Sequence, residues 1–154
     1  MGLKLIVVGK TKTLFFEQSE KEYLKRLNKY CRLNYIAVSS SKKSDVRDVC
    51  LKMEEEQILK NINSQDFVIL LDEKGKQYSS RDFAHQINER LIRDSNITFI
   101  IGGAFGFSEK IYQRSNLMWS LSSLTFPHHM VRTIFLEQLY RAFTILRGEK
   151  YHND

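Results

Sequence analysis

Apolar residues gather in short runs that longer polar stretches separate. Four runs cover residues 3–8, 33–38, 67–71 and 97–101, and a weaker fifth covers residues 117–121. Each is rich in β-branched or aliphatic residues and is bounded by Gly, Asp, Asn or Ser, which predicts β-strands. The runs at 67–71 and 97–101 are apolar nearly throughout, as strands covered by helices on both faces are. We therefore expect a parallel sheet.

Between these runs, apolar positions recur at helical spacing. The expected helices lie around residues 16–30, 46–53, 83–91 and 130–146. Ser80 and Ser108 are expected as N-caps, and Gly148 is expected to end the last helix. Alternating strands and helices predict a three-layer α/β domain with its ligand site at the carboxyl ends of the strands.

Length and charge narrow the class of protein. A chain of 154 residues suits one hydrophobic core, so we expect residues 1–154 to form a single domain. Lys and Arg outnumber Asp and Glu by 24 to 18, and the resulting charge of +6 favours a polyanionic partner such as nucleic acid.

The cellular location is also constrained. Cys31 and Cys50 are too few for a disulfide framework, which fits a reducing cytoplasm. The first residues lack the features of an export signal or a lipid anchor. No apolar run approaches the roughly 20 residues that a membrane-spanning helix needs. We expect a cytoplasmic protein without a membrane partner.

A glycine-rich segment follows the apolar run at 97–101. Gly102, Gly103 and Gly106 lack a Cβ atom, which allows tight turning and close approach of a ligand to the backbone. A plain turn and a loop that binds a phosphate or nucleotide both fit this pattern. The glycine spacing differs from a dinucleotide fingerprint, and the segment lies outside the first strand-to-helix turn, so nicotinamide binding is excluded.

Two further segments follow predicted strands. Residues 121–126, just before Pro127, form an unusually apolar loop that is able to hold a flat aromatic base while its backbone hydrogen-bonds to that base. After Leu71, the acidic residues 72–73 are expected to be a solvated turn, just as the glutamates at 54–56 are expected to be a solvated helix face. The three strand-end loops are expected to converge on one pocket.

Other site chemistries find little support. No Ser lies in a nucleophile-elbow pattern and neither Cys has a His nearby in the sequence, which argues against covalent catalysis. His128 and His129 are adjacent rather than four residues apart, and His85 is isolated, so no metal site is expected.

These segments jointly resemble the large-subunit rRNA methyltransferase H family over essentially the whole chain. The markers are Leu3-Lys4-Leu5 through Gly9-Lys10, Glu22-Tyr23-Leu24-Lys25-Arg26, Leu71 with Gly75-Lys76, Ile101-Gly102-Gly103 with Gly106, Thr125-Phe126-Pro127-His128 with Arg132, Glu137-Gln138-Leu139-Tyr140-Arg141-Ala142, and Tyr151-His152. The resemblance implies a three-layer, parallel-sheet α/β SPOUT fold with a C-terminal trefoil knot, a rare topology.

The resemblance also implies a function. It implies a homodimer that uses S-adenosyl-L-methionine to methylate N3 of a pseudouridine in helix 69 of 23S rRNA, within the assembled ribosome. It assigns cofactor binding to Leu71, Gly102, Gly103, Leu121, Ser122, Ser123, Leu124, Thr125 and Phe126. It makes His128, Arg132, Tyr151 and His152 the candidates for orienting the base and assisting proton removal. A sulfonium methyl is already activated, so transfer needs alignment and proton removal but no metal.

One departure from the family pattern concerns the tail. Family members commonly carry a basic residue after Tyr-His, whereas this chain has Asn153 and Asp154. A phosphate contact from the tail is therefore not expected here. The glycine segment and the Thr-Phe-Pro-His segment are retained, so the methylation assignment stands.

Two other classes of function stay open on the residues alone. A non-catalytic RNA-binding module would explain the positive charge, and it would bind RNA with a steep salt dependence while ignoring the cofactor. A phosphate- or nucleotide-binding α/β protein would use residues 102–106 to hold an anion. The expected convergence of three strand-end loops on one pocket favours the methyltransferase.

Overall fold

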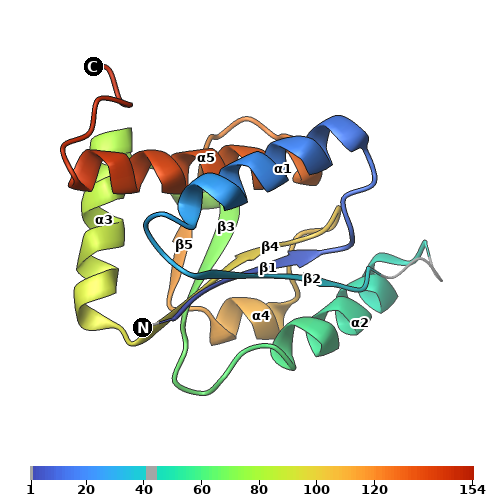
Figure 1. Ribbon diagram of the computed structural model, residues 1–154. Coiled ribbons are helices and arrows are strands. Elements are labelled where there is room, and N and C mark those ends of the chain that lie inside the picture. The colour runs from blue at the N-terminus through green and yellow to red at the C-terminus, as the bar shows by residue number, and fades with distance from the viewer. Residues whose placement is uncertain (1, 41–44) are drawn as a thin grey trace.

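The computed structural model describes residues 2–40 and 45–154, and it contains a five-stranded sheet (Figure 1). The strands are β1 (Gly2–Val8), β2 (Leu33–Val38), β3 (Phe67–Lys76), β4 (Asn96–Ile101) and β5 (Leu117–Trp119). The helices are α1 (Leu14–Leu27), α2 (Arg47–Leu59), α3 (Ser80–Arg93), α4 (Glu109–Arg114) and α5 (His128–Leu146). The strand order is β2-β1-β4-β3-β5 and every pair is parallel, which confirms the predicted parallel sheet.

Helices cover both faces of the sheet, giving three layers. Helices α1, α3 and α5 lie on one face, and α2 and α4 lie on the other (Figure 1). Because side chains alternate along a strand, Leu5 faces α1 and α5 while the next residue, Ile6, faces the layer of α2 and α4. This explains why the central strands are apolar at successive positions.

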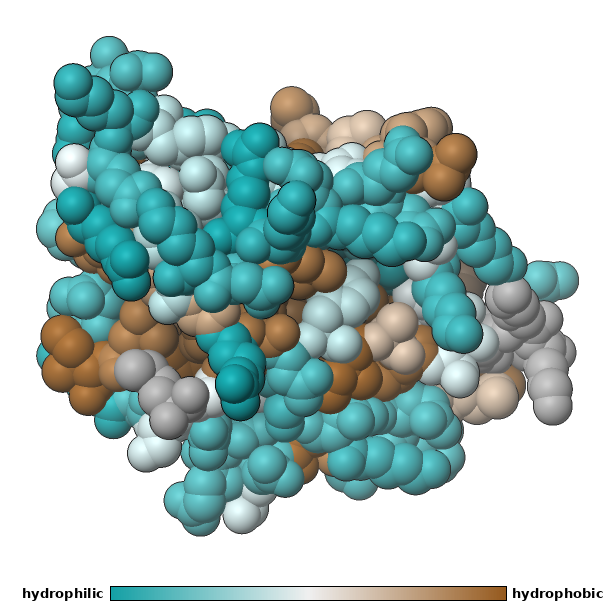
Figure 2. All heavy atoms as spheres, in the orientation of Figure 1, coloured by the Kyte–Doolittle hydropathy of each residue, from teal (hydrophilic) through white to brown (hydrophobic). Residues whose placement is uncertain are grey.

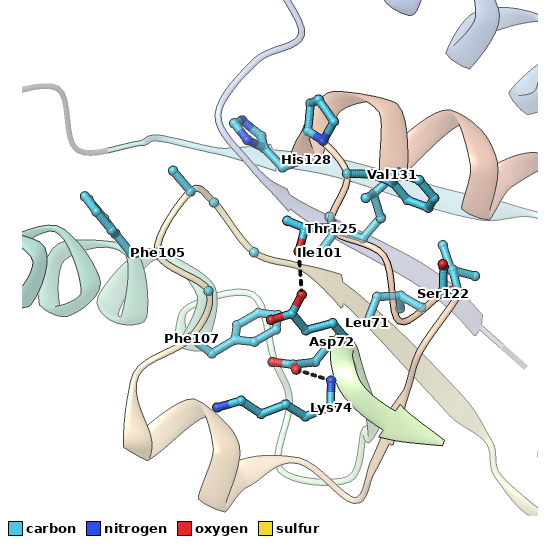
Figure 3. Close-up of a pocket in the computed structure, with 18 of the residues that line it drawn as sticks. Leu71, Asp72, Lys74, Ile101, Phe105, Phe107, Ser122, Thr125, His128 and Val131 are labelled. Carbon is cyan, nitrogen blue, oxygen red and sulfur yellow. Dashed lines mark hydrogen bonds between the residues drawn. The ribbon is translucent and has the colours of Figure 1, made fainter. Parts of the chain in front are cut away.

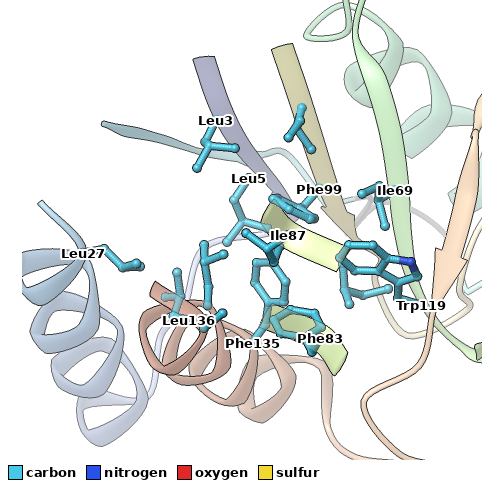
Figure 4. Close-up of a cluster of buried hydrophobic side chains, with 14 of the residues drawn as sticks. Leu3, Leu5, Leu27, Ile69, Phe83, Ile87, Phe99, Trp119, Phe135 and Leu136 are labelled. Atoms are coloured by element: carbon cyan, nitrogen blue, oxygen red, sulfur yellow. The ribbon is translucent and has the colours of Figure 1, made fainter. Parts of the chain in front are cut away.

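The larger core lies between the sheet and α1, α3 and α5 (Figure 4). Its centre is aromatic: Phe99 of β4 packs against Phe135 of α5 with ring centroids 5.0 Å apart, and against Trp119 of β5 at 6.0 Å. All three side chains are at most 2% exposed, and burying each contributes roughly 1.5–3 kcal/mol. This core fixes α5, whose first turn forms part of the site described below.

Local details differ from the sequence expectations in three places. Strand β3 continues past its expected end at residue 71 to Lys76, with an irregularity in its pairing to β5 after Leu71. The N-cap of α3 is Ser79 rather than Ser80, because the Ser79 hydroxyl accepts from the backbone N–H of Asp82. Strand β5 ends at Trp119 rather than at residue 121, because the Ser120 hydroxyl donates to the Ser122 carbonyl oxygen and turns the chain out of the sheet. The predicted Ser108 cap is confirmed.

The strand order brings three segments to one edge of the sheet. Strand β4 lies between β1 and β3, and β5 lies beside β3. The irregular part of β3 at residues 72–75 therefore lies near the loops at residues 102–106 and 120–127, which follow β4 and β5. Whether the chain is threaded into a trefoil knot here stays a prediction. No helix within residues 2–40 and 45–154 is long and apolar enough to cross a membrane.

Candidate functional site

The irregular part of β3 and the loops after β4 and β5 surround a cavity of about 1010 Å³ at the carboxyl edge of the sheet (Figure 3). Most residues that were predicted to bind a cofactor line it: Leu71, Gly102, Gly103, Leu121, Ser122, Leu124, Thr125 and Phe126. Ser123 is exposed and does not line the cavity. The structure thus brings the three predicted loops together around one space.

The glycine loop folds back on itself. Gly106 has a φ of +74°, a backbone conformation that residues with a side chain rarely adopt, and its N–H donates to the Gly103 carbonyl oxygen at 3.2 Å. A Cβ atom on Gly102 would lie 2.9 Å from the Gly106 carbonyl oxygen and 3.1 Å from the Phe107 ring. The loop therefore needs glycine at 102 for its own closure, whether or not a ligand approaches the backbone there.

The acidic residues 72–73 form part of strand β3, so the expectation of a solvated turn there is wrong. The Tyr112 hydroxyl donates to Asp72 Oδ2 at 2.6 Å, and the Lys74 backbone N–H donates to Asp72 Oδ1 at 2.8 Å. Burial and the Asp72 carboxylate raise the pKa of Tyr112. The Thr125 hydroxyl donates to Glu73 Oε2 at 3.0 Å, which joins β3 to the loop after β5 (Figure 3).

The expectation of a solvated face at residues 54–56 is wrong for two of its three glutamates. Glu54 and Glu55 are 7% and 6% exposed, and only Glu56 faces solvent. The Ser108 hydroxyl donates to Glu55 Oε2 at 2.6 Å. A Cβ atom on Gly103 would lie 3.2 Å from Glu54 Oε1. Helix α2 thus packs its carboxylates against the glycine loop and the start of α4.

His128 and Arg132 lie one turn apart at the start of α5 but have different surroundings. His128 lines the cavity, and burial, His129 and Arg132 lower its pKa to about 4, so its imidazole is neutral at pH 7. Arg132 is fully buried and does not line the cavity. Its guanidinium donates to the carbonyl oxygens of Val8 and Gly9 and to the Thr11 hydroxyl. These contacts fasten α5 to the end of β1.

Comparison with known proteins gives the family. The chain matches the family described as "Predicted SPOUT methyltransferase" over residues 1–152. It is 45% identical to "Ribosomal RNA large subunit methyltransferase H" of Clostridium botulinum strain Kyoto, with 99% of each chain covered, and 42% identical to the protein of that name from Clostridium tetani. The chain belongs to this family of SPOUT methyltransferases. The resemblance inferred from the sequence is confirmed.

A solved structure supports the fold of this SPOUT methyltransferase. The structure of a probable methylase family protein from Haemophilus influenzae Rd KW20 superposes with a TM-score of 0.56, covering 99% of this chain and 70% of that one. At 14% identity this likeness shows the fold alone. Within the described residues, the SPOUT methyltransferase has no group of three or more His, Cys, Asp or Glu side chains that could hold a metal ion.

The tail residues of the SPOUT methyltransferase lie far from the cavity of their own chain. The Tyr151 hydroxyl donates to Glu137 Oε1 at 3.1 Å, and His152 Nδ1 lies 3.2 Å from Arg141 Nη1. Arg141 is thirteen residues along α5 from His128, so at 1.5 Å per residue the two positions are about 20 Å apart. The structure therefore separates Tyr151 and His152 from His128.

The unusual end of the tail has a partner in the same chain. Asp154 accepts from Arg81 Nε at 2.8 Å and lies 3.0 Å from His152 Nε2. Asp154 thereby holds the tail against α3. The acidic residue that departs from the family pattern is part of an intramolecular contact rather than a free negative charge.

Several lining residues were missed by sequence reasoning. Arg47 at the start of α2 and Tyr112 on α4 reach the cavity because of how these helices pack, which no local motif encodes. Val131 lies three residues after His128 on α5, so helical spacing from a known site residue was the available signal. Phe105 lies within the glycine segment, but no motif marks it as a binding residue.

Proposed function

We propose that this protein transfers a methyl group from S-adenosyl-L-methionine to N3 of a pseudouridine in helix 69 of 23S rRNA, in the assembled cytoplasmic ribosome. The family membership makes the protein a methyltransferase, and the names of its relatives point to large-subunit rRNA. The observation that carries the proposal is the cavity bounded by the irregular part of β3 and the loops after β4 and β5.

The residues present fit an adenosyl cofactor. The cavity has the size of small-molecule sites, which run from about 300 to 1,000 Å³. Leu71 and Leu121 offer apolar surface for a flat base. Within the part of the chain that the structure describes, the backbone N–H groups of Thr125 and Phe126 donate to no protein acceptor, so they are available to the base. Asp72 offers a fixed negative charge to a cationic ligand.

The chemistry asked of the protein is alignment and proton removal. The cofactor would supply a methyl group activated by a sulfonium sulfur. The protein must hold the ring nitrogen in line and let its proton leave as the N–C bond forms and the C–S bond breaks. A neutral His128 at the cavity wall is suited to orient the base through a hydrogen bond. With a pKa of about 4, His128 is a poor proton acceptor at pH 7, because general bases work best with a pKa near the operating pH.

We include a homodimer in the proposal, because the tail is too far from the cavity to act within one chain. Tyr151 and His152 contact Glu137 and Arg141, which lie about 14 and 20 Å from His128 along α5. For either residue to contact the acceptor base, it must come from a second copy of the chain. Sedimentation equilibrium tests the dimer. In mixed dimers, a His152→Ala subunit and a subunit blocked at the cofactor cavity would then complement each other.

Two measurements test the proposal. Calorimetry is expected to show S-adenosyl-L-methionine binding at one site per chain. Mass spectrometry of nucleosides is expected to show N3-methylpseudouridine after incubation of the protein and cofactor with ribosomes that lack this methyl group. RNA binding without cofactor binding would instead support a non-catalytic RNA-binding module.

Neighbouring serines give a matched pair of variants for the cofactor site. Ser122 lines the cavity, whereas Ser123 beside it is exposed and does not. Ser122→Tyr is expected to fill the space and abolish cofactor binding. Ser123→Tyr is expected to leave the affinity within about twofold of wild type, since surface substitutions have small effects. Equal affinities in the two variants would place the cofactor elsewhere.

A further inference from the structure

A second cavity of about 600 Å³ adjoins the first. It lies at the carboxyl ends of β1 and β2, against α2 and the first residues of α5. Four residues line both cavities: Gly103, Ala104, Phe105 and His128. A methyl donor and its acceptor must meet, so a space that shares a wall with the cofactor cavity is suitably placed for the acceptor.

The shared wall carries an aromatic side chain that the core does not use. Phe105 is 41% exposed at the tip of the glycine loop. Figure 3 shows its ring at the edge of the first cavity opposite Ser122, directed away from Leu71. The bridge between Gly103 and Gly106 fixes the loop on either side of it. An exposed aromatic ring on a fixed loop is what RNA-binding proteins use to stack an unpaired base.

Charge in the second cavity is suited to a nucleic acid backbone. Lys10 and Lys12 line it, both are exposed, and neither forms an ion pair with an acid among residues 2–40 and 45–154. Glu54 also lines this cavity, but it is 7% exposed and packs beside Gly103. The solvent-facing charges of the cavity are therefore positive, and lysines at such positions bind phosphate.

We propose that the second cavity holds the acceptor nucleotide of the RNA, with its base stacked on Phe105 and its phosphate bound by Lys10 and Lys12. His128 then lies between base and cofactor, because it lines both cavities. This inference rests on the proposed function, since it assigns the substrate subsite of that reaction. It adds a specific role for Phe105, which phosphate binding or cofactor binding alone would not require.

The test measures methyl transfer to ribosomes that lack the methyl group, at saturating cofactor. Phe105→Ala and Phe105→Leu are expected to raise KM for the ribosome by about fivefold or more, because a stacked aromatic contributes about fivefold to a hundredfold in affinity. Phe105→Tyr is expected to restore KM. The cofactor Kd, measured by calorimetry, is expected to stay within about twofold of wild type in all three variants, because the Phe105 ring borders the first cavity only at its edge and points away from Leu71 (Figure 3).

A matched control is Phe15→Leu, because Phe15 is 62% exposed and lines neither cavity. Its KM is expected to equal that of wild type. The lysines are tested by Lys10→Gln with Lys12→Gln. This double variant is expected to reduce the slope of log KM against log salt by about one for each phosphate that the protein no longer binds.

The outcomes separate this inference from the proposed function. A wild-type KM in Phe105→Leu and Phe105→Ala, with methylation intact, would overturn the stacking role and leave the methyltransferase assignment standing. A cofactor Kd that rises with KM would mean that the Phe105 side chain contacts the cofactor, and it would also overturn the inference. Absence of cofactor binding by the wild-type protein would remove the proposed function itself.

Discussion

Replacement of Arg132 shows whether this residue stabilises the fold or acts on the substrate. The resemblance makes Arg132 a candidate for orienting the base, yet its side chain is fully buried and donates to Val8, Gly9 and Thr11. The contacts to Gly9 O and Thr11 Oγ1 measure 2.8 and 3.0 Å. We therefore expect Arg132→Met to act mainly on the free energy of unfolding.

The size of the effect follows from the oxygens left behind. Methionine keeps much of the volume of Arg132 but cannot donate, so the carbonyl oxygens of Val8 and Gly9 lose their partner. Each unsatisfied buried polar group costs about 1–3 kcal/mol. Relief from burying a guanidinium offsets part of this loss. A net loss of roughly 2–4 kcal/mol would lower Tm by about 4–16 °C in a chain of this length.

Thermal and urea unfolding measure the effect, and Arg114→Met is the control. Arg114 also donates to backbone carbonyl oxygens, those of Asn63 at 2.8 Å and Asp66 at 3.0 Å, but it is only partly buried. Its loss is expected to cost about 1 kcal/mol. If Arg132→Met unfolds at the wild-type temperature but loses methyl transfer at unchanged cofactor affinity, the structural explanation is refuted and Arg132 contacts the substrate.

Three further predictions concern protonation, packing and the tail. The pKa of His128 is about 4 in the folded chain and 6.5 ordinarily, so the unfolded chain binds more protons between these values and stability falls as pH drops from 6.5 towards 4. His128→Gln is expected to lose less free energy of unfolding than wild type as the pH is lowered through this range, as measured by urea unfolding. Gly75→Ala is expected to cost more stability than Gly148→Ala. A Cβ atom on Gly75 would lie 2.6 Å from the backbone of β5, whereas one on Gly148 would meet no atom and would be disfavoured only by the φ of +66°. Equal urea midpoints in the two variants would contradict this. Asp154→Asn is expected to speed hydrogen exchange at residues 149–154 with little change in Tm, because the pair with Arg81 is exposed; unchanged exchange would mean that other contacts hold the tail.

Much of the fold could be predicted from hydrophobic pattern because the sheet is covered on both faces. Such strands stand out as unbroken apolar runs, and β1, β2 and β4 were found to within one residue at each end. The second half of β3 was missed because residues 72–76 are polar or Gly and carry no apolar pattern. Strand β5 is short and ends where the Ser120 hydroxyl redirects the chain, and a side-chain bond of this kind leaves no periodic signal. Helix α4, with six residues, was anticipated only through its Ser108 cap.

The candidate site was partly predictable for the same reason. Glycine-rich and apolar loops at strand ends can be recognised from their composition, and in a parallel sheet such loops lie at the same edge. The burial of Glu54 and Glu55 was missed because charged residues on a helix usually face water, and only the packing of α2 on the glycine loop shows otherwise. The distance between His128 and His152 follows from the length of α5. It becomes informative because both residues were assigned to the same active site.

The arrangement of the two cavities follows from the strand order. Strand β4 lies between β1 and β3, so the loop at residues 102–106 emerges between the loop after β1 and the irregular part of β3. One side of this loop faces Leu71 and Thr125, and the other faces Lys10 and Lys12. The glycines let this loop turn tightly, so that it separates the two cavities, and Phe105 at its tip lines both of them. A fold with β1 next to β3 would leave no such shared wall, so the strand order itself brings the two cavities next to each other.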